Sequence, residues 1–136
     1  MTIRPGEFWV ADITFTNASG SKKRLVLVLW LDGADVVAAA VTSANPRTAM
    51  DDVLADWKTS CLRRASTVRL SRLDCLEQSL FIVRIGMISP SDAARVRQIW
   101  SQEVSTLVPV ITLTRTPLRS RLKKNPRFEA RPSGSA

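Results

Sequence analysis

Two long apolar runs dominate the pattern of hydrophobic and polar positions. Residues 24–31 and 35–42 are joined by Asp32-Gly33, a dipeptide typical of a tight hairpin turn. An antiparallel hairpin returns the chain to its starting edge. We therefore expect the basic cluster Lys22-Lys23-Arg24, before the first run, to lie close to Thr42-Ser43, at the end of the second.

Shorter apolar segments predict further strands at 6–13, 51–55, 66–70 and 81–88, each flanked by turn-forming residues. Several short strands separated by turns favour a small barrel. A helix should follow, because Ser89-Pro90 supplies a cap residue and a proline for the first helical position. Its apolar stripe runs to about residue 108. The predicted fold is mainly β with a C-terminal helix.

Length and composition narrow the class of protein. A chain of 136 residues predicts one domain, and its 45% apolar content is enough for an ordinary core. No apolar run has the length of a membrane span, and residues 1–7 lack the apolar region of a signal peptide, so we expect a cytoplasmic protein. Cys61 and Cys75 are expected to be buried thiols. With no histidine in the chain, neither a metal nor a cofactor is expected.

The net charge of +8 is unevenly distributed. Residues 115–136 hold seven of the twenty basic residues but one of the twelve acids, so +6 of the charge lies there. This Pro/Ser/Arg-rich segment has little to bury and is expected to be a disordered tail. The predicted domain is therefore 1–114, followed by a basic tail at 115–136. The nearly balanced charge of the domain makes the overall basicity weak support for nucleic-acid binding.

The two polar ends of the hairpin could handle a phosphate. An arginine can donate two parallel hydrogen bonds to phosphate oxygens, and a neighbouring hydroxyl can add a third, which suits Arg24 with Thr42 or Ser43. The alternative reading is two solvated hairpin ends. Among the tryptophans, Trp30 and Trp100 are expected in the core, and Trp57 is expected to be partly exposed and able to stack on a base.

The order of these segments resembles the MazF/PemK family of bacterial toxin endoribonucleases over residues 4–105. The resemblance begins with Arg4-Pro-Gly-Glu-Phe-Trp-Val10 and continues with a Gly/Ser loop, Lys23-Arg24 and the strand ending in Thr42-Ser43. It continues through Asp52-Val-Leu-Ala-Asp-Trp57 and Ser66-Thr-Val-Arg-Leu70, and it ends with Ile85-Gly-Met-Ile-Ser89.

This resemblance implies an SH3-like barrel of the MazF/PemK/CcdB kind, working as a homodimer. It implies metal-independent cleavage of single-stranded RNA, including mRNA, by attack of the ribose 2′-hydroxyl on the adjacent phosphate. It also implies a cognate antitoxin as partner. By the family pattern Arg24 and Thr42 occupy catalytic positions, and Arg69 matches an arginine that stabilises charge in some members. The expected substrate-binding residues are Lys22, Lys23, Ser43, Trp57 and Ser71.

Several positions depart from the family pattern. Ser71 stands where many members have an acid, the loop 16–21 has no acid, and the chain has neither histidine nor tyrosine. No general base is assigned; the remaining candidates are Glu7, Asp51, Asp52 and Asp74. Arg69 could instead form an ion pair with Asp52 or Asp56. The alternative function is a non-catalytic module on the same barrel that binds RNA or a protein, as gyrase-poisoning toxins do.

Overall fold

The computed structural model describes residues 2–14 and 20–107. It contains strands β1 (Glu7–Thr14), β2 (Ser21–Asp32), β3 (Asp35–Thr42), β4 (Asp51–Val53), β5 (Thr67–Glu77) and β6 (Phe81–Met87), a short 3-10 helix η1 (Gln78–Leu80), and helix α1 (Pro90–Leu107). The predicted mainly β fold with a C-terminal helix is confirmed. The predicted tail at 115–136 and its boundary at 114 lie outside the described residues.

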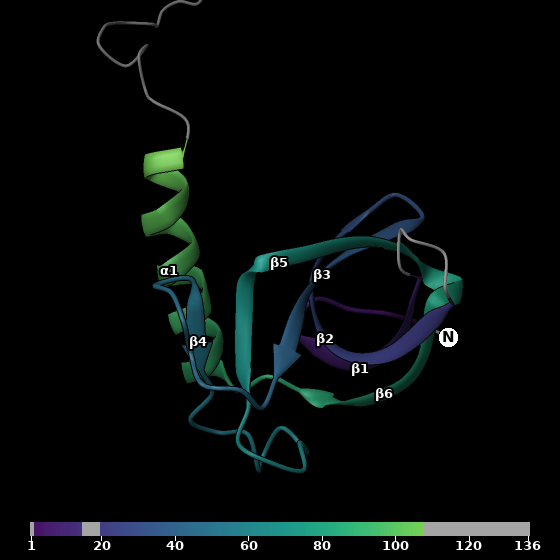
Figure 1. Cartoon of the computed structure of the whole chain (residues 1–136), viewed down its shortest axis with the longest axis horizontal. Helices are drawn as coiled ribbons and strands as arrows, with labels where there is room; N and C mark the ends of the chain where they lie inside the picture. The colour runs from purple at the N-terminus through teal and green to yellow at the C-terminus, as the bar shows by residue number, and fades with distance from the viewer. Residues whose placement is uncertain (1, 15–19, 108–136) are drawn as a thin grey trace, which may run out of the picture. The chain divides into compact units, whose positions relative to one another are not determined.

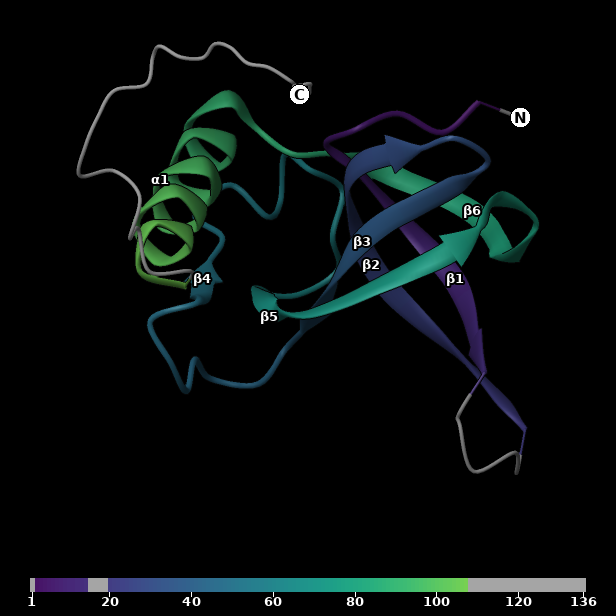
Figure 2. The same cartoon turned by 90° about the horizontal axis from the view of Figure 1, so that it is seen from above.

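All described strands belong to one antiparallel sheet with the order β4-β5-β3-β2-β1-β6. The β2–β3 hairpin forms at the predicted place, and Gly33 adopts the positive φ of +63° that its turn requires. Figures 1 and 2 show how strongly the sheet is curled. Side chains from five strands consequently share one interior cluster, which includes Trp9, Val26, Val28, Val36, Leu76 and Phe81.

The opposite face of the sheet carries a second apolar cluster. Phe8, Leu27, Val68 and Leu70 of the strands pack there with Val96 of α1. The helix begins as its sequence predicts, because the Ser89 hydroxyl accepts a hydrogen bond from the backbone N–H of Asp92 at 3.1 Å. The sheet and the helix up to Gln102 therefore form one compact unit. The described part of the chain contains no helix long and apolar enough to cross a membrane.

Glu7 is buried and connects the first residues of the chain to β1 and β6. Its carboxylate accepts hydrogen bonds from the Arg4 backbone N–H at 2.8 Å, the Trp9 indole at 3.0 Å and the Arg84 side chain at 2.7 Å. Burial alone would raise the pKa of Glu7, but these hydrogen bonds and the charge of Arg84 together hold the pKa below its ordinary value of 4.5. Glu7 is thus a structural residue and not a free general base.

Glu7→Gln is expected to lower the free energy of unfolding by about 1–3 kcal/mol at neutral pH, because hydrogen bonds to a charged acceptor are replaced by weaker ones. The folded-state pKa is depressed, so the contribution of Glu7 is complete above 4.5 and is lost as the pH falls through the folded value. Urea unfolding at neutral pH and at about pH 3 should therefore show the difference from wild type shrinking in acid. An equal difference at both pH values would contradict this account; Glu77→Gln, at an exposed position, is the control.

Candidate functional site

The strand register places the three predicted catalytic residues on one face of the sheet. Val26 of β2 lies opposite Ala40 of β3, and the same register carried two residues further sets Arg24 across from Thr42. On the other side of β3, Ala40 lies opposite Arg69 of β5. Directly paired residues point to the same face. Three adjacent strands, β2, β3 and β5, therefore carry Arg24, Thr42 and Arg69 on the same face of the sheet. These strands lie side by side in Figure 2.

Arg69 has an acidic partner in β4. Its Nε lies 3.5 Å from Oδ1 of Asp51, and the Asp51 side chain is 1% exposed. The alternative considered for Arg69, an ion pair with Asp52 or Asp56, is wrong in its partner, because β4 pairs with β5 so that Asp51 faces Arg69. Asp52 instead binds Arg95, and Asp56 accepts hydrogen bonds from two serines. Asp51 restricts the guanidinium of Arg69 to this part of the sheet.

Thr42 ends its strand in a turn that orients its hydroxyl. The Thr42 Oγ1 accepts a hydrogen bond from the backbone N–H of Ala44 at 3.1 Å. A hydroxyl that accepts one bond still has its own proton to donate. Thr42 is partly exposed and Ser43 is exposed, as are Arg24, Lys22 and Lys23 across the hairpin. This edge of the sheet can therefore present positive charge and hydroxyl donors to an anion.

Thr42 and Ser43 also line a pocket of about 440 Å³ on the side of the sheet that faces the β4–β5 loop. Its apolar lining comes from Val10, Leu25, Val41, Leu62 and Ile85. Arg63 and Arg64, both exposed, complete its polar lining. The sequence interpretation missed these two arginines. The available signal was an adjacent arginine pair just before the predicted strand at 66–70.

The loop that carries the two arginines is tightly anchored. The backbone N–H of Leu62 donates to the Trp57 carbonyl at 3.0 Å, and the Leu62 side chain is buried in the second apolar cluster. Gly86 of β6 lies against the backbone of Ser60, where an added Cβ would come within 2.0 Å of the carbonyl oxygen. The loop can pack this closely because residue 86 has no side chain.

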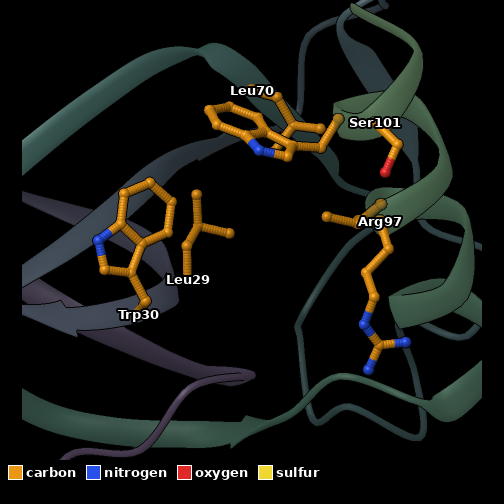
Figure 3. Close-up of a pocket in the computed structure, with 7 residues that line it drawn as sticks. Leu29, Trp30, Leu70, Arg97 and Ser101 are labelled. Carbon is orange, nitrogen blue, oxygen red and sulfur yellow. The ribbon is translucent and has the colours of Figure 1, made fainter. Parts of the chain in front are cut away.

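The tryptophans only partly match expectation. Trp57 is half-buried against the second cluster, with Lys58 Nζ 5.4 Å from its ring centroid, so partial exposure is confirmed. The expected core position of Trp30 is wrong, because its side chain is 43% exposed. It meets Trp100 edge to face at 6.0 Å beside a largely apolar pocket of about 310 Å³ between β2 and α1 (Figure 3).

The structure also places the two cysteines and Ser71. Cys61 and Cys75 are free, but both are exposed and not buried as expected. Ser71 is exposed and lies in a bulge of β5. Ala40 of β3 pairs with Arg69, but its neighbour Ala39 pairs with Leu73, so residues 70–72 of β5 have no direct partner in β3. Ser71 therefore lies outside the regular strand pairing that aligns Arg69 with β3.

The acidic residues considered as a general base do not line the pocket. Glu7 is engaged in its own network, Asp51 contacts Arg69, and Asp52 binds Arg95. Asp74 lies further along β5, opposite Ala38. None of the described residues that line the pocket carries a carboxylate. The pocket, and the sheet face that carries Arg24, Thr42 and Arg69, are therefore best suited to electrostatic stabilisation by arginines and hydroxyls.

Asp12 of β1 is another carboxylate near these strands that the sequence interpretation did not consider. Its Oδ1 is buried and accepts no hydrogen bond from the described residues. Asp12 pairs with Lys23, whereas the neighbouring Ala11 pairs with Arg24. Alternation along a strand therefore directs Asp12 to the opposite face of the sheet from Arg24.

Comparison with solved structures shows that this fold is that of MazF-type toxins. An endoribonuclease from a mycobacterial species, solved with its cognate antitoxin, superposes with a TM-score of 0.64 at 13% identity, covering 79% of this chain and all (100%) of that one. A chain of the MazE–MazF structure from Deinococcus radiodurans gives 0.62 at 16% identity, with coverage of 77% and 98%. The Mycobacterium tuberculosis toxin MazF-mt6 gives 0.56 at 15%, with coverage of 71% and 96%.

These likenesses establish the fold. The sequence matches no protein-family model, and no curated protein matches it either.

Proposed function

We propose that this chain is a MazF-like endoribonuclease toxin of a toxin–antitoxin pair, acting in the cytoplasm on single-stranded RNA such as mRNA. The observation that carries the proposal is the placement of Arg24, Thr42 and Arg69 on one face of β2, β3 and β5. The same fold occurs in an endoribonuclease solved with its cognate antitoxin. The resemblance of the sequence to the MazF/PemK family agrees with both.

The proposed reaction needs no metal. The ribose 2′-hydroxyl gives up its proton to water as its oxygen attacks the adjacent phosphorus, and the 5′-oxygen takes up a proton from water as its bond to phosphorus breaks. The products are a cyclic phosphate and a 5′-hydroxyl end. The guanidinium of Arg24 donates two hydrogen bonds to the non-bridging phosphate oxygens as their charge increases. The Thr42 hydroxyl donates a third, and Arg69 stabilises charge at the leaving oxygen.

We propose two protein partners. A second copy of the chain would form a homodimer and widen the surface available to several nucleotides. An antitoxin would cover the basic edge of Lys22, Lys23 and Arg24 with an acidic segment, since opposite charges favour association at such a surface. The structurally similar proteins include a mycobacterial endoribonuclease solved with its cognate antitoxin and a MazE–MazF structure from Deinococcus radiodurans.

The test is cleavage of a long mixed-sequence RNA by the purified chain in excess EDTA, followed by mapping of the new 5′ ends. Cuts at one short motif, with 5′-hydroxyl and cyclic-phosphate ends, are expected. The same reaction with added Mg²⁺ is the control for metal dependence. Intact RNA under both conditions would refute nuclease activity, and cleavage only with Mg²⁺ would refute the metal-independent mechanism.

A non-catalytic binding module is the second candidate. It is favoured by the pocket lining, which carries no carboxylate among the described residues, and by the serine at position 71. Tight RNA binding without cleavage would support it. Ser71→Asp then tests whether an acid has been lost: a gain of cleavage would indicate a nuclease that lacks its base, and continued inactivity would favour the binding function.

A further inference from the structure

The pocket at the β4–β5 loop has a lining that suits an RNA base. We propose that Arg63 and Arg64 read a base of the bound RNA that presents hydrogen-bond acceptors, guanine or uracil. This inference rests on the proposed ribonuclease function and names the part of the substrate that the pocket selects. The pocket lies on the opposite face of the sheet from Arg24 and Arg69, because its Leu25 and Val41 alternate with Arg24 and Thr42 along their strands. Thr42, at the end of β3, belongs to the catalytic row and also lines the pocket, so an RNA that passes this strand end can reach both.

The pocket lining divides into an apolar part and a polar part. Val10, Leu25, Val41, Leu62 and Ile85 provide an apolar surface, which suits the face of a base and not a phosphate. The volume of about 440 Å³ lies within the range of ligand pockets in proteins. Unstacked bases in single-stranded RNA are the groups that proteins commonly insert into such pockets.

The polar side chains of the pocket offer mainly hydrogen-bond donors. Arg63 and Arg64 can only donate, and neither forms an ion pair with a carboxylate of the described residues. The lining offers hydroxyls but no carboxylate to accept from the amino groups of adenine or cytosine. A guanidinium fork matches the adjacent O6 and N7 of guanine, and it can donate to the O4 of uracil. The pocket therefore favours the oxo bases.

The loop that carries the two arginines has a fixed backbone, and discrimination between bases requires donors in fixed positions. The backbone on either side of the arginines is held. Leu62 is buried, and the Ser66 hydroxyl donates to the Arg64 carbonyl at 2.8 Å. Close contact between Gly86 and Ser60 fixes the loop against β6. The two arginine backbones are thus positioned before RNA binds, although their side chains are exposed.

The test compares the cleavage motif of wild type with that of the double variant Arg63→Ala/Arg64→Ala. Wild type is expected to require guanine or uracil at one fixed position. The double variant should lose that preference by about tenfold or more while preferences at other positions remain, since one bidentate base contact contributes roughly 1–3 kcal/mol. Arg72→Ala, which removes an exposed arginine of β5 outside the pocket, should leave the motif unchanged.

Two results would overturn the inference while leaving the ribonuclease function intact. One is a motif whose arginine-dependent position is adenine or cytosine. The other is an unchanged motif in the double variant with uniformly slower cleavage, which would assign the arginines to phosphates.

If no RNA is cleaved, the proposed function fails, and binding then tests the pocket separately. Fluorescence anisotropy would measure the affinity for short oligonucleotides that differ at single positions. A guanine or uracil preference that disappears in the double variant would support the pocket assignment. Equal affinity for all four bases in wild type would reject it.

Discussion

Replacing Arg24 by alanine is expected to reduce the rate of RNA cleavage by about 10²–10³-fold, the effect typical of removing one donor that stabilises a developing oxyanion. Arg24 lies across from Thr42 on the face that also carries Arg69. Its fork can hold two phosphate oxygens at once, whereas the Thr42 hydroxyl has one proton to donate and the Arg69 guanidinium is paired with Asp51. Single-turnover cleavage of an RNA that contains the mapped motif gives the measurement.

Two further variants separate charge from geometry. Arg24→Lys keeps the charge but loses the fork, so an intermediate rate is expected. Arg97→Ala removes an exposed arginine of α1 and should cleave like wild type. Because Arg24 is itself exposed, its alanine variant is expected to lose less than about 1 kcal/mol of unfolding free energy and to stay folded in the assay. A folded Arg24→Ala protein with wild-type activity would remove Arg24 from the proposed mechanism.

The parts of the fold set by local pattern could be predicted from sequence. The β2–β3 hairpin follows from two apolar runs around Asp32-Gly33, and α1 follows from Ser89-Pro90 and its apolar stripe. The second half of β5 could not be predicted. Its pairing with β3 bulges after Arg69, and this interrupts the alternation that marks a strand. Beyond the bulge, residues 73–77 of β5 form a strand because they pair with β3. A local sequence pattern does not show this long-range pairing.

In the candidate site, too, local contacts could be predicted from the sequence and long-range contacts could not. Antiparallel return of the hairpin was enough to predict that Arg24 and Thr42 would be neighbours, and their register supports it. The partner of Arg69 depended on the long-range pairing of β4 with β5, which selected Asp51 over its neighbours. Arg63 and Arg64 line the pocket only because their loop packs against Gly86 and the second core cluster. Sequence spacing alone contains neither contact.

A buried carboxylate, Asp92, connects α1 to the segment that includes β4. Its side chain is fully buried and accepts hydrogen bonds from the backbone N–H groups of Ala55 and Asp56, at 3.0 and 2.9 Å. Arg95 lies 3.4 Å from Asp92 and also binds Asp52 and the Val53 carbonyl. Burial raises the pKa of Asp52 despite the hydrogen bond and charge of Arg95, and the Asp92 carboxylate adds to the rise.

Asp56, in the segment after β4, also binds the start of α1. Its carboxylate accepts hydrogen bonds from the hydroxyls of Ser89 and Ser91 at 2.7 and 2.9 Å, and these bonds lower the pKa of Asp56. The helix start and the chain after β4 are therefore held by reciprocal contacts. Because β4 also carries Asp51, the partner of Arg69, the position of a proposed catalytic arginine depends on this connection.

Asp92→Ala is expected to lower the free energy of unfolding by about 2–4 kcal/mol, because it leaves two backbone N–H groups without an acceptor and removes the ion pair between Asp92 and Arg95. Asp92→Asn retains one acceptor oxygen but turns an amide N–H₂ toward a donor, so a loss of at least half that size is expected. Ser91→Ala, at the adjacent exposed position, should cost less than about 1 kcal/mol. Urea unfolding followed by tryptophan fluorescence gives all three values, and an Asp92→Ala loss no larger than that of Ser91→Ala would show that the carboxylate does not hold β4 to the helix.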